Sequence, residues 1–245
     1  MNKILMSSEK EEIILNSDKY EFQKDGTFSL EVENLEKDIF LVVSENVKVV
    51  LNLLGKNTKI NIHLQIKNGA TLIFNYLLLE GNINLKVDLV EEKAAFYLNY
   101  SILNSNNSNN QIIINHIASK TESILKNHGF SKNHANLILD VSAYINKEAS
   151  KCISHQDNQI IENENSLSQI NPNLYIDNYD VDASHSAYVG EFKESELFYL
   201  MSRGLTEEMS KFLLLKSFLI GSFDLEEKIQ EKYYHEVIKY FDKEV

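Results

Sequence analysis

Cysteine is almost absent from this chain of 245 residues, in which Cys152 stands alone. A single cysteine cannot form an internal disulfide, and without a Cys-x-x-Cys pair the sequence offers no thiolate set for zinc or for a stable cluster. We therefore expect a protein of a reducing compartment. The expected role of Cys152 is that of a small buried side chain in a strand, ahead of redox chemistry or metal ligation.

Positive charge is also scarce, because 24 Lys and Arg face 36 Asp and Glu, for a net charge of -12. Nucleic-acid binding draws much of its affinity from clustered Lys and Arg, and docking on anionic lipid needs basic segments as well. No apolar stretch approaches the length that spans a bilayer, and the first twenty residues lack the apolar core of a signal peptide. We expect a cytoplasmic protein that binds neither nucleic acid nor membranes.

The chain has one proline and eight glycines, few for a sandwich of tight turns. From about Tyr20 to about Ile176, short runs rich in β-branched and aromatic residues recur at roughly ten-residue spacing, which predicts an all-β architecture. A sandwich and a β-helix both fit, and the β-helix is slightly favoured because its coils turn through broader bends. The runs begin at Phe28, Phe40, Val47, Ile60, Ala70, Ile83, Ala94, Gln111, Ala135 and Leu174.

After Gly190 the pattern becomes helical. The first helix should end at Gly204, the second should have Thr206 as its N-cap, and the third should begin near Leu225 with Asp224 as its N-cap. The chain therefore divides into three predicted parts: a short N-terminal segment (1–19), a β core (20–190) and a C-terminal helical domain (191–245).

Motifs of common catalytic sites are missing. No GxSxG, Walker A or HExxH sequence is present, so neither an autonomous hydrolase nor an ATPase is supported. The stretch Asp177–Gly190 (DNYDVDASHSAYVG) is rich in Asp but has no glycine where a calcium loop turns. The histidines outside this stretch are not grouped at metal-ligand spacing, and Asn104 to Asn110 is interpreted as a turn or a loose loop. Those histidines are His63, His116, His128, His134, His155 and His235.

The segment from Pro172 to Leu219 strongly resembles the SufB/SufD family of iron–sulfur cluster assembly proteins. The match includes Ser184-His185 and the run Leu197 to Gly204 (LFYLMSRG), in the order in which that family has them. Upstream, segments around His116 and Gln156 resemble the family in the same order, whereas residues before about Asn57 match little. From this resemblance, we expect a shorter N-terminal region than in typical members.

The resemblance implies a right-handed parallel β-helix with a helical C-terminal domain. SufB-like members carry a cysteine in a Cys-Asp-Ser segment, and this chain has His155 to Ile160 (HQDNQI) in that region, so it is similar to SufD. The implied function is a scaffold without catalysis of its own, which pairs with a SufB-like paralogue and binds a SufC-like ABC ATPase. The isolated chain would hold no cofactor stably, and a transient iron–sulfur cluster would form only in the complex.

The resemblance also implies which residues matter. His185 is the candidate iron or cluster ligand at a subunit interface, since a neutral imidazole binds iron and releases it more readily than a thiolate does. Asp180 and Asp182 are expected mainly as surface carboxylates. Ser186 and Tyr188 stand where the family has Gly and Thr, so a close backbone approach there would be widened. The candidate ATPase-contacting residues are Ser202, Arg203, Gly204, Leu213, Leu214 and Phe218.

Two other classes of function stay open. One is a homodimeric β-solenoid that serves as an interaction module and has lost cluster chemistry. The other is a β-helix enzyme acting on acidic polysaccharide with Asp177, Asp180 and Asp182 as its carboxylates, which the negative charge of the chain disfavours.

Overall fold

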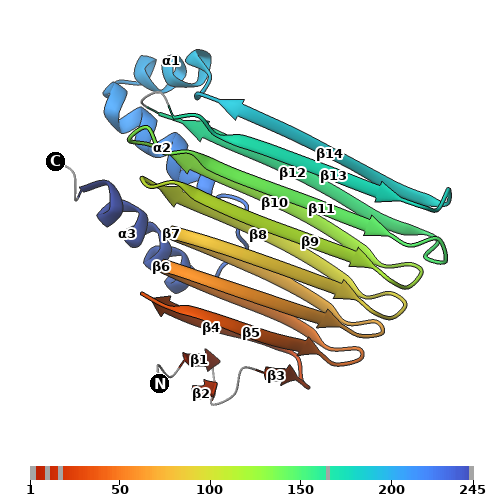
Figure 1. Ribbon diagram of the computed structural model, residues 1–245. Helices are drawn as coiled ribbons and strands as arrows, with labels where there is room; N and C mark the ends of the chain where they lie inside the picture. Colours follow the sequence, from red (N-terminus) through yellow and green to blue (C-terminus); the bar gives the residue numbers. More distant parts are fainter. Residues whose placement is uncertain (1–3, 9–11, 16–18, 164–165, 243–245) are drawn as a thin grey trace.

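The chain winds into a β-helix whose coils stack along one axis (Figure 1). The computed structural model describes residues 4–8, 12–15, 19–163 and 166–242. Successive coils place strands in two facing walls, and parallel hydrogen bonds join each strand to its counterpart in the next coil. The predicted parallel β-helix is confirmed.

Two strands are long enough to bend at a corner and contribute to both walls. The first wall consists of β4 (Gly26–Glu33), the first halves of β6 (Lys48–Ile66) and β7 (Thr71–Leu89), β8 (Ala95–Asn104), β10 (Glu122–Ser131), β12 (Cys152–Glu162) and β14 (Val181–Gly190). The second wall consists of β3 (Lys19–Phe22), β5 (Glu36–Val43), the second halves of β6 and β7, β9 (Ser108–His116), β11 (Leu137–Ile145) and β13 (Gln169–Ile176). An antiparallel pair, β1 (Ile4–Ser8) and β2 (Glu12–Leu15), adds to β4.

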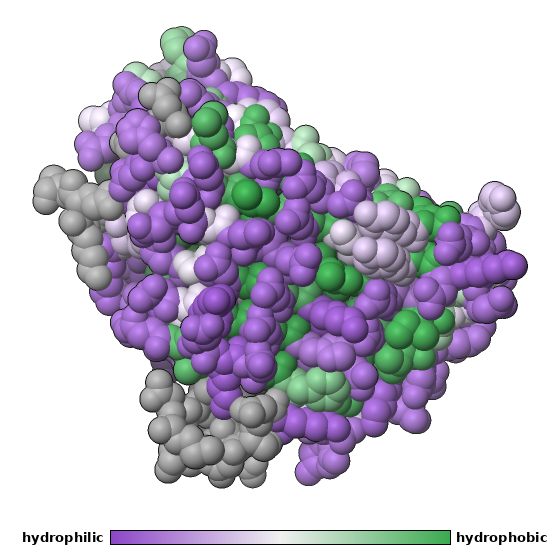
Figure 2. All heavy atoms as spheres, viewed as in Figure 1, coloured by the Kyte–Doolittle hydropathy of each residue, from purple (hydrophilic) through white to green (hydrophobic). Residues whose placement is uncertain are grey.

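The core fills the lumen, by which we mean the space between the two walls. Side chains of a strand alternate between lumen and outside, so parallel register stacks equal positions of successive coils. Leu51, Phe74 and Leu98 are such a stack and are almost completely buried. On the outside, hydrophilic side chains predominate on the face in Figure 2, with apolar patches between them.

Corners between the walls explain the scarcity of glycine. Asn34, Asn57 and Glu80 have φ angles of 51°, 49° and 62°, and the Asn57 amide donates a hydrogen bond to the Asn34 side-chain oxygen at 2.7 Å. Asparagine tolerates this left-handed region better than most residues do. The corners at the other ends of the strands also have positive φ angles, at Asn46, Gly69, Lys93, Lys120 and Lys151.

Three polar stretches differ from the prediction. β10 and β12 are absent from the predicted apolar runs because Ser and Asn occupy several of their lumen positions. In the segment Asn104 to Asn110 only residues 105–107 connect the strands, because Asn104 ends β8 and Ser108 begins β9. The Asn110 side-chain oxygen accepts hydrogen bonds from the Ile83 amide and the Tyr100 hydroxyl. Asn110 thus bonds two buried polar groups, whereas the Asn104 side-chain oxygen is buried without a hydrogen-bond partner among the described residues.

Three helices form the C-terminal part: α1 (Glu194–Ser202), α2 (Glu207–Ile220) and α3 (Glu227–Asp242). As predicted, Gly204 follows α1 with a φ of 94°, and the Thr206 hydroxyl caps α2 by accepting from the Met209 amide. The prediction of Asp224 as the cap of α3 is wrong. Leu225 packs against the buried apolar cluster beneath the helices, so α3 begins two residues later, at Glu227. None of the described helices is long and apolar enough to cross a membrane.

The C-terminal end of α2 is fastened to the outside of the first wall. A ring nitrogen of His128 on β10 donates to the Phe218 carbonyl at 2.6 Å, and the Ser101 hydroxyl on β8 donates to the Leu219 carbonyl at 2.5 Å. The His128 ring also stacks on the Phe218 ring, with centroids 4.5 Å apart. Carbonyls of the last helical turn have no partner within the helix, so these contacts fix both the position and the direction of α2.

Substitution of Gly81 by alanine tests the corner geometry. Gly81 has a φ of 128°, and an added Cβ would lie 1.9 Å from the Thr58 carbonyl oxygen. We expect Gly81→Ala to lower the free energy of unfolding by about 3 kcal/mol or more. Gly204→Ala is the control, because its φ is also positive but no atom lies within 4 Å of the added Cβ, and it should cost only about 1 kcal/mol. If urea unfolding shows the same loss of unfolding free energy for both variants, the close contact between Gly81 and Thr58 at this corner would be contradicted.

Candidate functional site: the open end of the β-helix

The last coil, formed by β13 and β14, has no further coil on it within the described part of the chain. β14 pairs only with β12 and β13 only with β11, so each strand keeps one edge without a strand partner. Apolar side chains of this coil are consequently accessible, such as Val189 and Ile176. An exposed edge of this kind is a template for pairing with another strand.

His185 lies in the middle of β14, on the side that faces the lumen. Its partner in the register is Gln156 on β12, and the partner of Gln156 is Leu125 on β10. Gln156 and Leu125 are buried, and because parallel register keeps stacked side chains on one face, His185 extends the same inward row. His185 itself is exposed because no coil covers it. The candidate ligand therefore stands at the mouth of the lumen.

The aspartates of the same stretch do not accompany His185. Asp182 lies on the outer face, with its carboxylate 3.8 Å from the ring of His155, whose other nitrogen is 2.7 Å from the Ser184 hydroxyl. Asp177 and Asp180 are exposed and lie in the turn before β14. Asp182 thus points away from the mouth, and all three aspartates are exposed, as expected for surface carboxylates.

Below His185, the lumen is lined with polar side chains that sequence reasoning did not single out as site residues. Asn127 and Asn158 hydrogen bond to each other at 2.8 Å, and Gln156 reaches the Asn173 carbonyl of the opposite wall at 3.5 Å. Among the described residues, the side-chain oxygens of Asn127 and Gln156 are buried without a hydrogen-bond partner. In these two rows the next coil toward the N-terminus has Leu98 and Tyr100, so the amide side chains of the rows are confined to the coils beneath the mouth.

A chain of hydrogen bonds occupies the neighbouring rows. The two ring nitrogens of His116 lie 2.8 Å from the Thr121 hydroxyl and 2.9 Å from the Ser123 hydroxyl, and Ser123 lies 3.0 Å from the Ser154 hydroxyl. Thr121 donates to the Ala118 carbonyl, so a neutral His116 can donate to Thr121 while it accepts from Ser123. Burial lowers the pKa of His116 to about 4, in agreement with a neutral ring.

Cys152 lies at the end of this series of hydrogen bonds, next to Thr121. It is 1% exposed, and its sulfur lies 3.3 Å from the Thr121 hydroxyl and 3.5 Å from the Ala118 carbonyl. The expectation of a small buried side chain in a strand agrees with this position. No group of three His, Cys, Asp or Glu side chains among the described residues is placed to hold a metal ion. His185 accordingly belongs to no such group within the described part of the chain.

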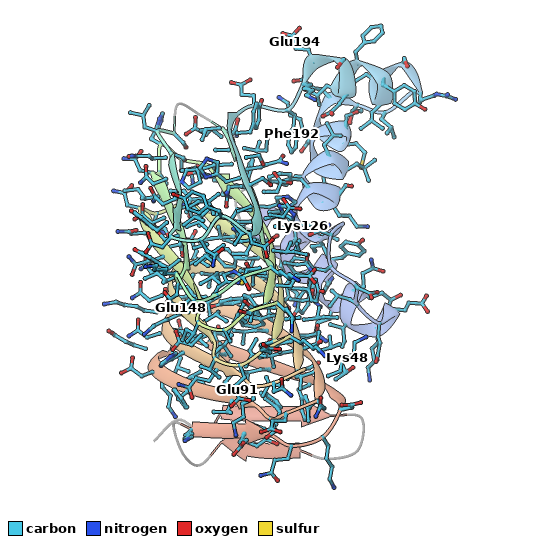
Figure 3. All side chains as sticks on the ribbon, turned by 90° about the vertical axis from the view of Figure 1, so that its right-hand side faces the viewer. Lys48, Glu91, Lys126, Glu148, Phe192 and Glu194 are labelled. Atoms are coloured by element: carbon cyan, nitrogen blue, oxygen red, sulfur yellow. The ribbon has the colours of Figure 1, made fainter. Side chains whose placement is uncertain are left out.

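The candidate ATPase-contacting residues on α1 and α2 differ in how exposed they are. α1 has no buried residue, and the side chains of Phe198 and Tyr199 are 73% and 57% exposed. Figure 3 shows α1 projecting from the top of the molecule, beyond the last coil. Ser202 donates to the Tyr199 carbonyl at 2.7 Å, and the Arg203 guanidinium lies over the Tyr199 ring. These contacts lie within α1 and its C-cap, so they leave the apolar surface of α1 open.

The candidates on α2 are half-buried, unlike those of α1. Phe218 packs against the cluster beneath the helices and stacks on His128. Leu214 lines a hollow between α2 and the outer face of β12 and β14, and Leu213 is also half-buried. Leu214 and Phe218 therefore serve partly as internal packing.

Comparisons with known proteins agree on one family. Residues 51–218 match the model described as SUF system FeS cluster assembly, SufBD core domain. The iron–sulfur cluster assembly protein SufD of Bacillus subtilis is 35% identical over 114 residues, which cover 46% of this chain and 26% of that protein. A SufBD family protein of Pyrococcus horikoshii is 52% identical over 40 residues, which cover 16% of this chain and 9% of that protein.

A SufBD family protein of Staphylococcus haemolyticus is 30% identical over 106 residues, which cover 42% of this chain and 23% of that protein. The chain thus matches about a quarter or less of the length of each of these three relatives.

The depressed pKa of His116 makes stability depend on pH. The folded protein holds the neutral ring down to a pH of about 4, whereas the unfolded chain binds a proton near 6.5. Stability is therefore complete above 6.5 and falls as the pH drops toward 4, by at most about 3 kcal/mol from this group. His116→Gln should flatten this part of the pH profile in urea unfolding. An unchanged slope between pH 6.5 and 4.5 would show that His116 is not the group responsible.

Proposed function

The chain belongs to the SufBD family of the SUF system for iron–sulfur cluster assembly, and we propose that it is the SufD-like scaffold subunit of this machinery. In this role it pairs with a SufB-like paralogue through the last coil, binds a SufC-like ATPase through its helices, and contributes His185 to a site where a nascent cluster forms. The cluster is the cargo of the site and leaves with the recipient protein.

The observation that carries the proposal is the position of His185. A histidine at the mouth of an uncovered lumen, on a strand with one edge without a strand partner, is arranged to meet groups of a second chain. Pairing of β14 with a strand of that chain would satisfy the edge amides and carbonyls and bury Val189. It would also enclose His185, and exclusion of water favours assembly of a cluster that solvent would attack.

The fastening of α2 supports a coupling between the ATPase and the site. α2 is held to β8 and β10 by Ser101 and His128, and β10 is two strands from β14 in the same wall. A force on the exposed α1 and the start of α2 is therefore delivered to the wall that carries His185. ATP-driven movement of the bound ATPase would in this way open and close the junction between the two scaffolds.

Co-expression tests the role of His185. The chain is produced with its SufB-like and SufC-like partners and purified without oxygen, and the iron and sulfide content of the complex is measured. His185→Ala should leave the complex intact, because the backbone edge of β14 that pairs with the partner is unchanged, and should lower the iron content at least roughly tenfold. His235→Ala, at an exposed position on α3, is the control and should have no effect. Failure of the wild-type chain to bind either partner would refute the proposed function, and a purely homodimeric chain would favour the interaction module.

Exposed apolar residues of α1 give a test of the ATPase contact. Phe198→Ser should weaken binding of the SufC-like subunit about fivefold or more without loss of stability, because Phe198 makes its apolar contacts only in the complex. Ile117→Ser is the matched control, since Ile117 is also exposed but follows β9 at the other ends of the strands. Isothermal titration of both variants gives the affinities, and equal effects would place the contact outside α1.

A further inference from the structure

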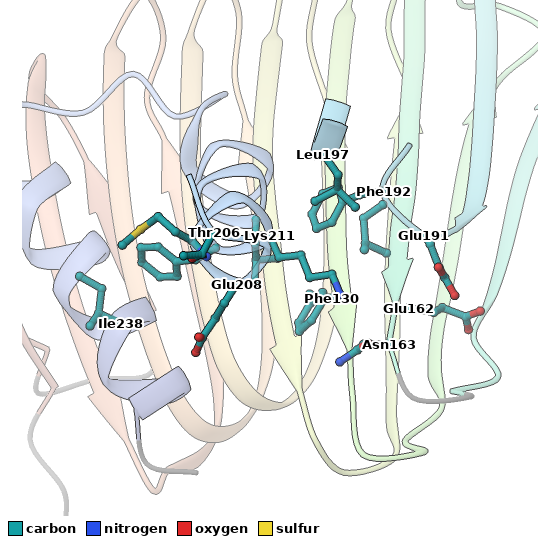
Figure 4. A pocket seen from close by; sticks show the side chains of 14 residues that line it. Phe130, Glu162, Asn163, Glu191, Phe192, Leu197, Thr206, Glu208, Lys211 and Ile238 are labelled. Atoms are coloured by element: carbon teal, nitrogen blue, oxygen red, sulfur yellow. The ribbon is translucent and has the colours of Figure 1, made fainter. Parts of the chain in front are cut away.

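A cavity of about 640 Å³ lies where the helices meet the end of the β-helix (Figure 4). β10 and β12 supply its floor, the segment between β14 and α1 supplies one side, and the three helices supply the rest. This volume lies within the range of about 300–1,000 Å³ that is usual for ligand-binding sites. Its apolar lining residues are Phe130, Ile161, Phe192, Leu197, Met209, Phe212, Leu215 and Ile238.

The lower part of the cavity is lined by buried, well-packed apolar side chains. Phe130, Ile161 and Leu215 are at most 6% exposed and belong to the cluster beneath the helices. Toward the opening, Leu197 on α1 is only half-buried and Met209 at the start of α2 is 49% exposed. The apolar packing between helices and wall therefore stops before the cavity is filled, and an inserted apolar side chain would complete it.

The rim of the cavity is acidic. Glu162, Glu191 and Glu208 line it from β12, from the segment after β14 and from the first turn of α2. Lys211 is the cation among the lining residues, and its ammonium forms a 2.7 Å ion pair with the Glu207 carboxylate. The rim consequently has an excess of negative charge, which attracts a basic segment and repels an acidic one.

We propose that this cavity receives an aliphatic or aromatic side chain of the ATPase subunit, carried on a segment that contains Lys or Arg next to the anchor. The inference rests on the proposed function, because it names the chemistry of the ATPase surface that meets the helices. The anchor fills the apolar floor and the flanking cations face the glutamates of the rim. Binding energy at interfaces is usually concentrated in such buried anchors, and complementary charge fixes their orientation.

A second copy of the chain is a poorer occupant. Its most exposed apolar helix, α1, carries Glu194 and Glu196 beside Phe198, so insertion of that helix would bring carboxylates onto an acidic rim. The whole chain also has a net charge of -12. Like charges at close range oppose such self-association.

Charge reversal on the rim tests the proposal with the full chain and the SufC-like ATPase subunit. The double variant Glu191→Lys, Glu208→Lys should bind that subunit at least tenfold more weakly at low salt, and its affinity should depend less on salt than that of the wild type. The control is Glu45→Lys, Glu148→Lys, two exposed acids in the turns between β5 and β6 and between β11 and β12, which should change neither. Titration calorimetry at two salt concentrations measures both quantities.

A separate variant tests the apolar lining of the cavity. Leu197→Asp places a charge in the cavity wall and should abolish most of the affinity, whereas Leu197→Met should restore it because it returns an apolar side chain. Thermal unfolding must show that all variants remain folded. Unchanged affinity in the charge-reversal and Leu197→Asp variants, with normal binding by the wild type, would overturn the proposal and leave the proposed function standing. Absence of binding by the wild type would instead reject the proposed function itself.

Discussion

Parallel stacking in register is the constraint on which the rest of the structure depends. Because each strand bonds to its counterpart in the next coil, every inner strand of a wall is satisfied on both edges and every lumen side chain is covered by the next one. The stack has to end somewhere, and within the described residues it ends at β14 without a cover. His185 is exposed for this reason alone, since the position below it in the row is buried.

The same stacking divides the lumen into two parts. The early coils are filled by rows such as Leu51, Phe74 and Leu98, which provide the apolar burial that holds the walls together. Beneath the mouth, the rows change to Ser, Asn, Gln and His. Buried amides and hydroxyls contribute less to stability than well-packed apolar groups do, and two of these oxygens have no protein partner in the described chain. Polarity at this place therefore adds less to stability than the apolar rows of the early coils do.

The apolar runs of the sequence predict most of the strands, because alternation at positions such as Ile60, Ile62 and Leu64 is the direct consequence of one buried face. They fail at β10 and β12, where lumen positions are polar and alternation of hydrophobicity disappears. The helix caps at Thr206 and Gly204 follow from local chemistry and could be predicted. The start of α3 could not, since it depends on packing of Leu225 against a distant wall.

For the candidate site, sequence alone identifies His185 but not its direction. Whether a β-strand histidine faces the lumen or the outside is decided by register, which only the folded stack provides. Asp182 illustrates this point. It lies on the same strand as His185, and yet it faces outward, toward the ring of His155. His116 and Ser123 lie in one short segment that resembles the family, but their hydrogen bond to each other and the link to Ser154, 31 residues further on, depend on the stacked register, which the sequence does not show.

Hydrogen exchange of the last coil tests most directly whether another chain completes it. The backbone amides of β13 and β14 on the edge without a strand partner should exchange quickly in the isolated chain. In the presence of the SufB-like partner, they should become protected by at least roughly tenfold, while the amides of the inner strands β7 and β8 stay unchanged. Exchange of β13 and β14 at the same rate with and without a bound partner would contradict the account, because the mouth that holds His185 would then remain open in the complex.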